Sequence, residues 1–173
     1  MGGPAAAGYP VSQRFEFAGR PTQVFQKLVL QYHDEDRSIQ ALNIFDLLHN
    51  QGLDDALAKK QIPPPELTDA DTGLTWQQVV DRHMGFLDDA PAFQTAYRSV
   101  PDAMTRYGLP VTHPTREGNV IVVRFQRAVL QLWLDETPWS HIGDMTVVNG
   151  GDIAKELGLF PTQALTPDPQ PIP

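Results

Sequence analysis

The chain contains no cysteine among its 173 residues. This absence excludes disulfide bonds, thiol nucleophiles, cysteine-ligated zinc and iron–sulfur clusters. Long apolar stretches are missing too, so the sequence predicts no transmembrane helix. Residues 1–7 lack both the basic start and the hydrophobic middle of a signal peptide. Two interpretations follow: a cytoplasmic protein, or an exported protein whose leader is absent from this sequence.

Basic residues are also scarce. With 13 lysines and arginines against 21 aspartates and glutamates, the net charge is −8. Such a charge repels nucleic-acid phosphates and anionic lipid headgroups, so we predict neither nucleic-acid binding nor membrane insertion. Asparagine is rare, whereas proline is frequent, at 16 residues. Stiffened loops and few thermolabile residues are typical of thermostable proteins.

One short motif occurs twice, one hundred residues apart. Each copy begins with a glycine and a proline two residues later, and continues to a Phe-Gln pair at the same distance. The first copy contains Gly8-Tyr9-Pro10-Val11-Ser12 and Phe25-Gln26, and the second contains Gly108-Leu109-Pro110-Val111-Thr112 and Phe125-Gln126. Because no gap is needed within the motif, we interpret it as a duplication.

Each copy predicts a turn followed by a β-hairpin. The hairpin turns are expected near residues 18–20 and 117–119, where glycine is central. In the second copy the strand is expected to continue through the Phe-Gln pair. Two alternating faces are then predicted: one with Phe125, Arg127, Val129 and Gln131, the other with Gln126, Ala128, Leu130 and Leu132.

The segment between the copies has helical periodicity. Residues 42–49, 53–60, 75–87 and 91–100 each place apolar side chains on one helix face. Thr75 and Gln78 form a capping-box pattern, and Trp76 is expected on the apolar face of the helix that follows. The sequence therefore predicts an α+β fold, in which two short β-hairpin repeat motifs pack with an intervening segment of three to four short helices.

The predicted organisation is a single globular domain at residues 8–165. It contains repeat one (8–40), a helical insert (41–100), repeat two (101–149) and a C-terminal helix (150–165). Residues 1–7 are expected to be disordered. Residues 166–173 are expected to form a proline-rich tail.

No catalytic, metal or cofactor motif is specific enough to assign a reaction. Acidic residues such as Asp81, Asp88, Asp135 and Glu136 could supply a carboxylate pair, as in most acidic proteins. Gly150-Gly151-Asp152 precedes a short helix but lacks the rest of a phosphate-binding loop. We therefore predict a non-catalytic protein with no cofactor and no metal site.

Aromatic and amide side chains in or beside the two copies are the best candidates for ligand binding. Aromatic rings stack on the apolar faces of sugars, and amides bond to sugar hydroxyls. The candidates are Tyr9, Gln26, Gln31, Tyr32, Tyr107, Gln126, Gln131, Trp133 and Trp139. A purely structural role, in which these rings and amides complete the core, is the alternative.

The motif resembles the LGFP repeat of bacterial cell-wall-associated proteins. The matching residues are Gly8, Pro10, Ser12, Phe25, Gln26 and Tyr32, and Gly108, Pro110, Phe125, Gln126 and Trp133. Where that repeat carries two glycines, this chain has Lys27-Leu28 and Arg127-Ala128. The layout is also similar to uncharacterised modules in exported proteins of thermophilic bacteria, which share the patterns at residues 43–49 and 149–159. These resemblances imply an extracytoplasmic or cell-surface protein.

The leading hypothesis is a non-catalytic module of the cell envelope that binds cell-wall glycan. The first alternative is a structural or protein–protein interaction domain of an exported protein, with a surface protein as partner. The second is a hydrolase of cell-wall polymer, which requires two carboxylates that converge in a cleft.

Overall fold

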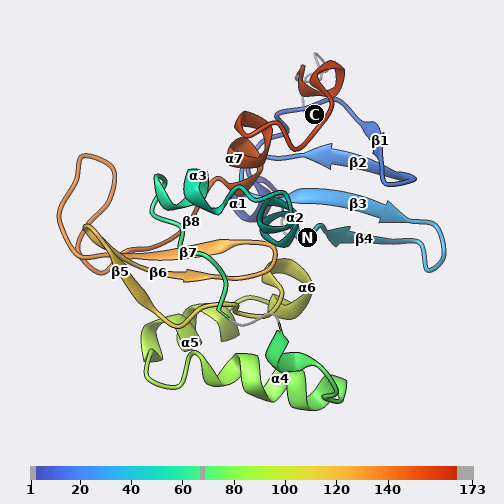
Figure 1. Ribbon diagram of the computed structural model, residues 1–173. Coiled ribbons are helices and arrows are strands. Elements are labelled where there is room, and N and C mark those ends of the chain that lie inside the picture. Colours follow the sequence, from blue (N-terminus) through green and yellow to red (C-terminus); the bar gives the residue numbers. More distant parts are fainter. Residues whose placement is uncertain (1–2, 67–68, 167–173) are drawn as a thin grey trace.

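The computed structural model describes residues 3–66 and 69–166, and its β structure forms two four-stranded antiparallel sheets (Figure 1). In each sheet the strands are neighbours in sequence order. The first sheet contains β1 (Phe15–Phe17), β2 (Arg20–Val24), β3 (Val29–His33) and β4 (Ser38–Ala41). The second contains β5 (Thr115–Glu117), β6 (Val120–Arg124), β7 (Val129–Trp133) and β8 (Met145–Val147). The α+β class with two hairpin-rich units is therefore confirmed.

Short helices flank each sheet and fill the segment between them. They are α1 (Gly3–Ala7), α2 (Ile44–Asn50), α3 (Asp54–Ala58), α4 (Trp76–Gly85), α5 (Pro91–Arg98), α6 (Ala103–Tyr107) and α7 (Gly150–Glu156), with 3-10 turns at Asp69–Asp71 and Thr162–Leu165. Part of the N-terminal segment predicted to be disordered forms α1, and Ala7 is buried. Of the predicted tail, residues 167–173 lie outside the described residues. We call residues 3–50 the first unit and residues 103–156 the second unit.

The shared motif holds the same local structure in both units. Gly8 and Gly108 have φ of +80° and +77°, a region that favours glycine. A Cβ atom on Gly8 would lie 2.6 Å from the Cβ of Gln26, so this position also requires a residue without a side chain. The Gln26 Oε1 accepts a hydrogen bond from the Tyr9 amide, and the Gln126 Oε1 accepts one from the Leu109 amide, both at 3.0 Å.

The predicted continuous strand through residues 120–132 is wrong. β6 ends at Arg124 and β7 begins at Val129, so the Phe-Gln pair stands in the tight connection between two antiparallel strands. Phe125 donates its amide to the Ala128 carbonyl at 2.8 Å and closes this turn. The alternation predicted for the two faces therefore does not run across residues 125–128.

Ser12 and Thr112 are structural as well. The Oγ of Ser12 accepts the Val24 amide at 2.8 Å, and the Oγ1 of Thr112 accepts the Arg124 amide at 3.0 Å. Both hydroxyl-bearing residues are buried. Each one satisfies a main-chain donor at the end of a strand, which would otherwise be buried without a partner.

The helix at the C-terminal end of each unit, α2 in the first and α7 in the second, bonds to the other unit. At the start of α2, in the first unit, Phe45 donates its amide to the Gln126 carbonyl at 3.2 Å. At the start of α7, in the second unit, Gly151 donates its amide to the Gln26 carbonyl at 2.9 Å. The inner faces of both sheets and these two helices share one core, which includes Val24, Val29, Phe45, Leu48, Val122, Val129, Ala154 and Phe160. The two units therefore share a hydrophobic core.

The outer faces of the two sheets differ. Below the second sheet in Figure 1 lie α4 and α5, and Phe93 and Tyr97 of α5 belong to the same core as Val123, Phe125 and Leu130. The Tyr97 ring stacks on the Phe125 ring, with centroids 5.5 Å apart. Within the part of the chain that the structure describes, no corresponding helix pair covers the outer face of the first sheet, which is the surface described next.

Candidate functional site

The outer face of the first sheet is more polar than its counterpart in the second. Residues one hundred apart occupy equivalent strand positions: Pro21 and Ile121, Gln23 and Val123, Leu30 and Leu130, Tyr32 and Leu132. Ile39 pairs with Tyr32 across β3 and β4, and its side chain is 53% exposed. Thus the covered face is wholly apolar at these positions, whereas the open face carries an amide, a phenol and an exposed isoleucine.

Two hollows lie at this open face and beside its edge strand β4. One hollow, of about 300 Å³, is lined by Arg14, Pro21, Thr22, Gln23, Phe25, Leu30, Gln31, Tyr32 and Ile39. A second hollow, of about 370 Å³, is lined by Asp36, Ser38, Ile39, Gln40, Trp76, Met104, Thr105, Gln126 and Arg127. Because Ile39 borders both hollows, we treat them together as one groove.

Two aromatic side chains stand in different parts of this groove. Tyr32 lies on β3 in the first hollow and is half-buried. Trp76 lines the second hollow and is 66% exposed. The prediction that Trp76 packs on the apolar face of its helix is wrong. The capping box of Thr75 and Gln78 does form, and it places Trp76 at the first residue of α4, where its side chain remains largely in solvent.

Charged and amide groups line the second hollow together with Trp76. Arg127 is held in place by the Oδ1 of Asn43, at 2.7 Å from its Nε, and by the main-chain carbonyls of Met104 and Thr105. Its burial lowers the pKa of the guanidinium. On the other side, hydrogen bonding from Ser38 lowers the pKa of Asp36. The groove thus offers hydrogen-bond donors and acceptors beside flat apolar surfaces.

The nine residues predicted to bind ligand do not gather at one place. Tyr32, Gln31 and Gln126 line the groove, but the two amides are bonded within the fold. The Nε2 of Gln31 donates to the Phe17 carbonyl and to the Thr22 Oγ1, both at 3.0 Å, and Gln31 is buried. Gln26 and Gln126 hold the glycine turns through their Oε1 atoms. Gln131 is half-buried on β7.

The other predicted aromatic residues divide between core and surface. Tyr107 is only 6% exposed and packs against Tyr97 and Phe125. Trp133 is half-buried, and its Nε1 donates to the Thr146 Oγ1 at 3.0 Å. Tyr9 and Trp139 are 59% and 76% exposed and line neither hollow of the groove.

Sequence reasoning missed Ile39 and Trp76 as parts of the site, along with Arg14 and Gln23. A signal for two positions was present in the alignment of the copies. Gln23 and Tyr32 replace the apolar residues Val123 and Leu132 of the second copy. Polar replacement at a strand position that is apolar in a duplicate indicates a face that has become exposed.

A buried charge cluster lies away from the groove, where α2 and α3 meet the second sheet. The Arg124 side chain is fully buried, and its Nη1 lies 3.0 Å from the Asp54 Oδ1. The Asp54 Oδ2 lies 2.5 Å from the His49 Nδ1. Partial burial works against it, but hydrogen bonds from His49 and Arg124 lower the pKa of Asp54. The cluster fixes α2 and α3 to the second sheet.

Other histidines and acids form isolated pairs rather than a metal site. His113 Nδ1 lies 2.7 Å from Glu66 Oε2, and His141 Nδ1 lies 2.8 Å from Glu136 Oε2. Across the described residues, no group of three or more histidines and acids could hold a metal ion. Nor does any described helix have the length and apolar character needed to cross a membrane.

Comparison with known proteins assigns no family to this fold. No family model matches the chain, and no match was found among curated proteins or solved structures.

Proposed function

We propose that the protein is a non-catalytic binding module of the cell envelope, whose groove between Tyr32 and Trp76 accommodates a glycan chain. The observation that carries the proposal is the contrast between the two sheets. In the second unit this outer face is apolar and packs in part against α5, with a hollow of about 630 Å³ left between them, whereas in the first unit it is open and partly polar. The resemblance to the LGFP repeat supports a ligand in the cell wall.

The groove has the chemistry that an uncharged polysaccharide requires. The Tyr32 and Trp76 rings offer apolar faces on which pyranose rings stack. The side-chain nitrogens of Gln23 and Gln40 donate within the fold, to the Ser12 carbonyl at 3.2 Å and the Ser38 Oγ at 3.0 Å. Their side-chain oxygens and the Arg127 guanidinium are therefore the hydrogen-bonding groups proposed for hydroxyl and acetamido substituents. An open groove rather than an enclosed cavity suits an internal stretch of a long chain, because the chain can enter and leave at both ends.

Two binding measurements test the proposal. The purified protein is mixed with insoluble peptidoglycan in a sedimentation assay, and titrated calorimetrically with a β-1,4-linked N-acetylglucosamine tetramer. We expect Tyr32→Ala and Trp76→Ala each to weaken binding about tenfold, which corresponds to about 1.4 kcal/mol for the loss of one stacking surface. Both side chains are at least partly exposed, so both variants should retain the native melting temperature.

Tyr9→Ala is the matched control. Tyr9 is an exposed tyrosine of the same unit, but it lines neither hollow of the groove. Its removal should leave the affinity unchanged. Equal affinities of the native protein and the Tyr32→Ala, Trp76→Ala double variant would refute glycan binding at this groove. Binding of a protein instead, abolished by the same two substitutions, would favour the interaction-domain alternative.

A further inference from the structure

The connection between the last two strands differs greatly between the units. In the first unit, residues 34–37 join β3 to β4. In the second unit, residues 134–144 join β7 to β8, and we call this segment the Trp139 loop. Because the short connection already allows the same antiparallel pairing, the longer loop is not required by the sheet. Its additional residues therefore call for a different explanation.

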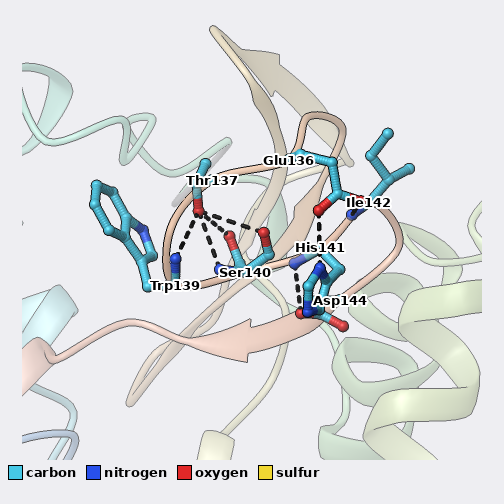
Figure 2. A network of polar contacts seen from close by, with 7 residues as sticks. All are labelled: Glu136, Thr137, Trp139, Ser140, His141, Ile142 and Asp144. Carbon is cyan, nitrogen blue, oxygen red and sulfur yellow. Dashed lines mark hydrogen bonds and ion pairs between the residues drawn. The ribbon is translucent and has the colours of Figure 1, made fainter.

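The Trp139 loop has a defined internal structure at its tip (Figure 2). Thr137 and Ser140 pair as an antiparallel bridge, so that Pro138 and Trp139 form the turn between them. The Thr137 Oγ1 accepts the Ser140 amide at 3.0 Å and lies 2.7 Å from the Ser140 Oγ. This bridge fixes the main chain that carries the indole.

A second group of contacts fixes the returning half of the loop (Figure 2). The Glu136 carboxylate accepts the Ile142 amide at 3.3 Å and pairs with the His141 Nδ1 at 2.8 Å. The Asp144 Oδ2 accepts the His141 amide at 2.7 Å. The loop is therefore ordered by its own side chains, and a ligand that binds it need not supply the ordering energy.

This ordered loop displays an aromatic ring to solvent. Trp139 is 76% exposed, more than any other large hydrophobic residue among those that the structure describes. An exposed indole on a rigid turn, with hydroxyl and imidazole groups in the same loop, is a second stacking platform of the kind found in the groove. In Figure 1 the loop lies at the left edge of the molecule, whereas β3 and β4 of the groove lie at the right.

We infer that the Trp139 loop is a second glycan-binding surface, and that the protein bridges two glycan segments. The inference rests on the proposed function of the groove, and it adds a cross-linking activity. Since the Trp139 loop and strands β3 and β4 lie on opposite sides of the molecule in Figure 1, we expect that a short oligosaccharide does not contact both. A polymer suspension offers many chains, so a protein with two sites joins them and gains apparent affinity without any new contact at the groove.

The experiment compares binding of a short ligand with bridging of a long one. Affinity for the N-acetylglucosamine tetramer is measured by calorimetry, and bridging is measured as light scattering when the protein is added to soluble glycol chitin. Native protein should raise the scattering. Trp139→Ala should reduce that increase at least fivefold and lower apparent affinity for the polymer, while the groove's affinity for the tetramer stays within twofold. Gel filtration of both proteins tests whether they are monomers, because an oligomer could bridge chains through its grooves alone.

Each outcome separates the two ideas. Trp76→Ala should weaken tetramer binding about tenfold and reduce bridging as well, because bridging needs two sites. If Trp139→Ala binds the tetramer and scatters light as strongly as the native protein, the bridging inference is overturned, whereas the proposed function of the groove stands. Loss of the native fold is not expected, but Thr137→Val provides a second test. It keeps the indole and removes the Oγ1 contacts that order the turn, so it should weaken bridging less than Trp139→Ala does. Absence of any polymer binding by the native protein overturns both proposals.

Discussion

Replacing Asp54 by asparagine tests how the protein tolerates a buried charge. The Arg124 guanidinium is fully buried, and Asp54 is the acid that pairs with it. The Arg124 guanidinium also donates hydrogen bonds to the main-chain carbonyls of Phe45, at 2.6 Å, and Pro63, at 3.0 Å. The Arg124 Nε has no hydrogen-bond partner among the described residues. Asparagine keeps the shape of Asp54 but removes the negative charge, so the buried cation would be left with two carbonyl dipoles and the Coulombic attraction of Asp46.

The expected loss of stability is about 3 kcal/mol. Unit charges about 4 Å apart attract by about 4 kcal/mol at an effective dielectric constant of about 20. Removing one partner of a buried pair costs about 3–5 kcal/mol, and the 25% exposure of the Asp54 side chain places this pair at the lower end. Urea unfolding at pH 7 measures the effect. With a denaturant slope of about 2 kcal/mol per molar, the midpoint should fall by about 1.5 M.

Arg124→Met provides the control, because methionine fills much of the same space without charge. We expect this variant to lose less stability than Asp54→Asn, since it leaves no unpaired buried ion. In the Arg124→Met background, Asp54→Asn should cost less than about 1 kcal/mol. An equal cost in both backgrounds would refute the electrostatic explanation.

The pH dependence of the Asp54 effect has a definite sign. The pKa of Asp54 is lower in the folded protein than in the unfolded chain. Its stabilising contribution is therefore complete above the unfolded pKa of about 3.9, and is lost as the pH falls through the folded pKa. The difference between native protein and Asp54→Asn should narrow accordingly in strong acid.

Two further predictions concern α7 and α2. A Cβ on Gly151 would lie 1.8 Å from the Phe25 carbonyl oxygen, so Gly151→Ala should lower the free energy of unfolding in urea by about 2–4 kcal/mol. The control is Gly85→Ala at the end of α4, where the added Cβ would lie 3.8 Å from the Asp88 Oδ2; it should leave the free energy of unfolding unchanged or raise it by up to about 1 kcal/mol. Burial, partly offset by Arg124 and His49, raises the pKa of Asp46 to about 6. Because the pKa is higher in the folded protein than in the unfolded chain, stability falls as Asp46 ionises between about pH 4 and 6. Asp46→Asn should therefore raise the free energy of unfolding by about 1–2 kcal/mol at pH 7.5 and leave it unchanged near pH 3.5. Equal increases at both pH values would contradict this explanation.

Local signals in the sequence predicted several elements correctly. Glycine at the centre of residues 18–20 and 117–119 gave the turns between the first two strands of each sheet, because these turns depend on a few residues. The capping box at Thr75 placed the start of α4 for the same reason. Pro91 likewise opens α5. In each case, neighbouring residues alone determine the structure.

The turns at the two Phe-Gln pairs were missed because their sequence looks like a strand. Gln126 and Arg127 are not typical turn residues, and the turn depends on partners about twenty residues away in the chain. The main-chain N–H of Gln126 donates to the Leu109 carbonyl at 3.1 Å, and the main-chain N–H of Arg127 donates to the Tyr107 carbonyl at 3.0 Å. Periodicity within a window cannot detect such contacts, since the partners lie outside it.

The site was only partly predictable, because residues that both copies share form the turns and strand ends, whereas residues that differ between the copies, such as Gln23 and Tyr32, line the groove. Residues that recur, such as Gly8 and Gln26, build the turn and strand ends that both units need. Tyr32 was predicted and lines the groove, but its significance lies in its counterpart, the apolar Leu132 under the helical insert. The two units share a scaffold of strands and turns, and their surfaces differ at the open face and at the Trp139 loop, where the proposals place ligand. When two units of one chain share the same strand order, candidate ligand-binding residues are therefore best sought at exposed positions where the two units differ.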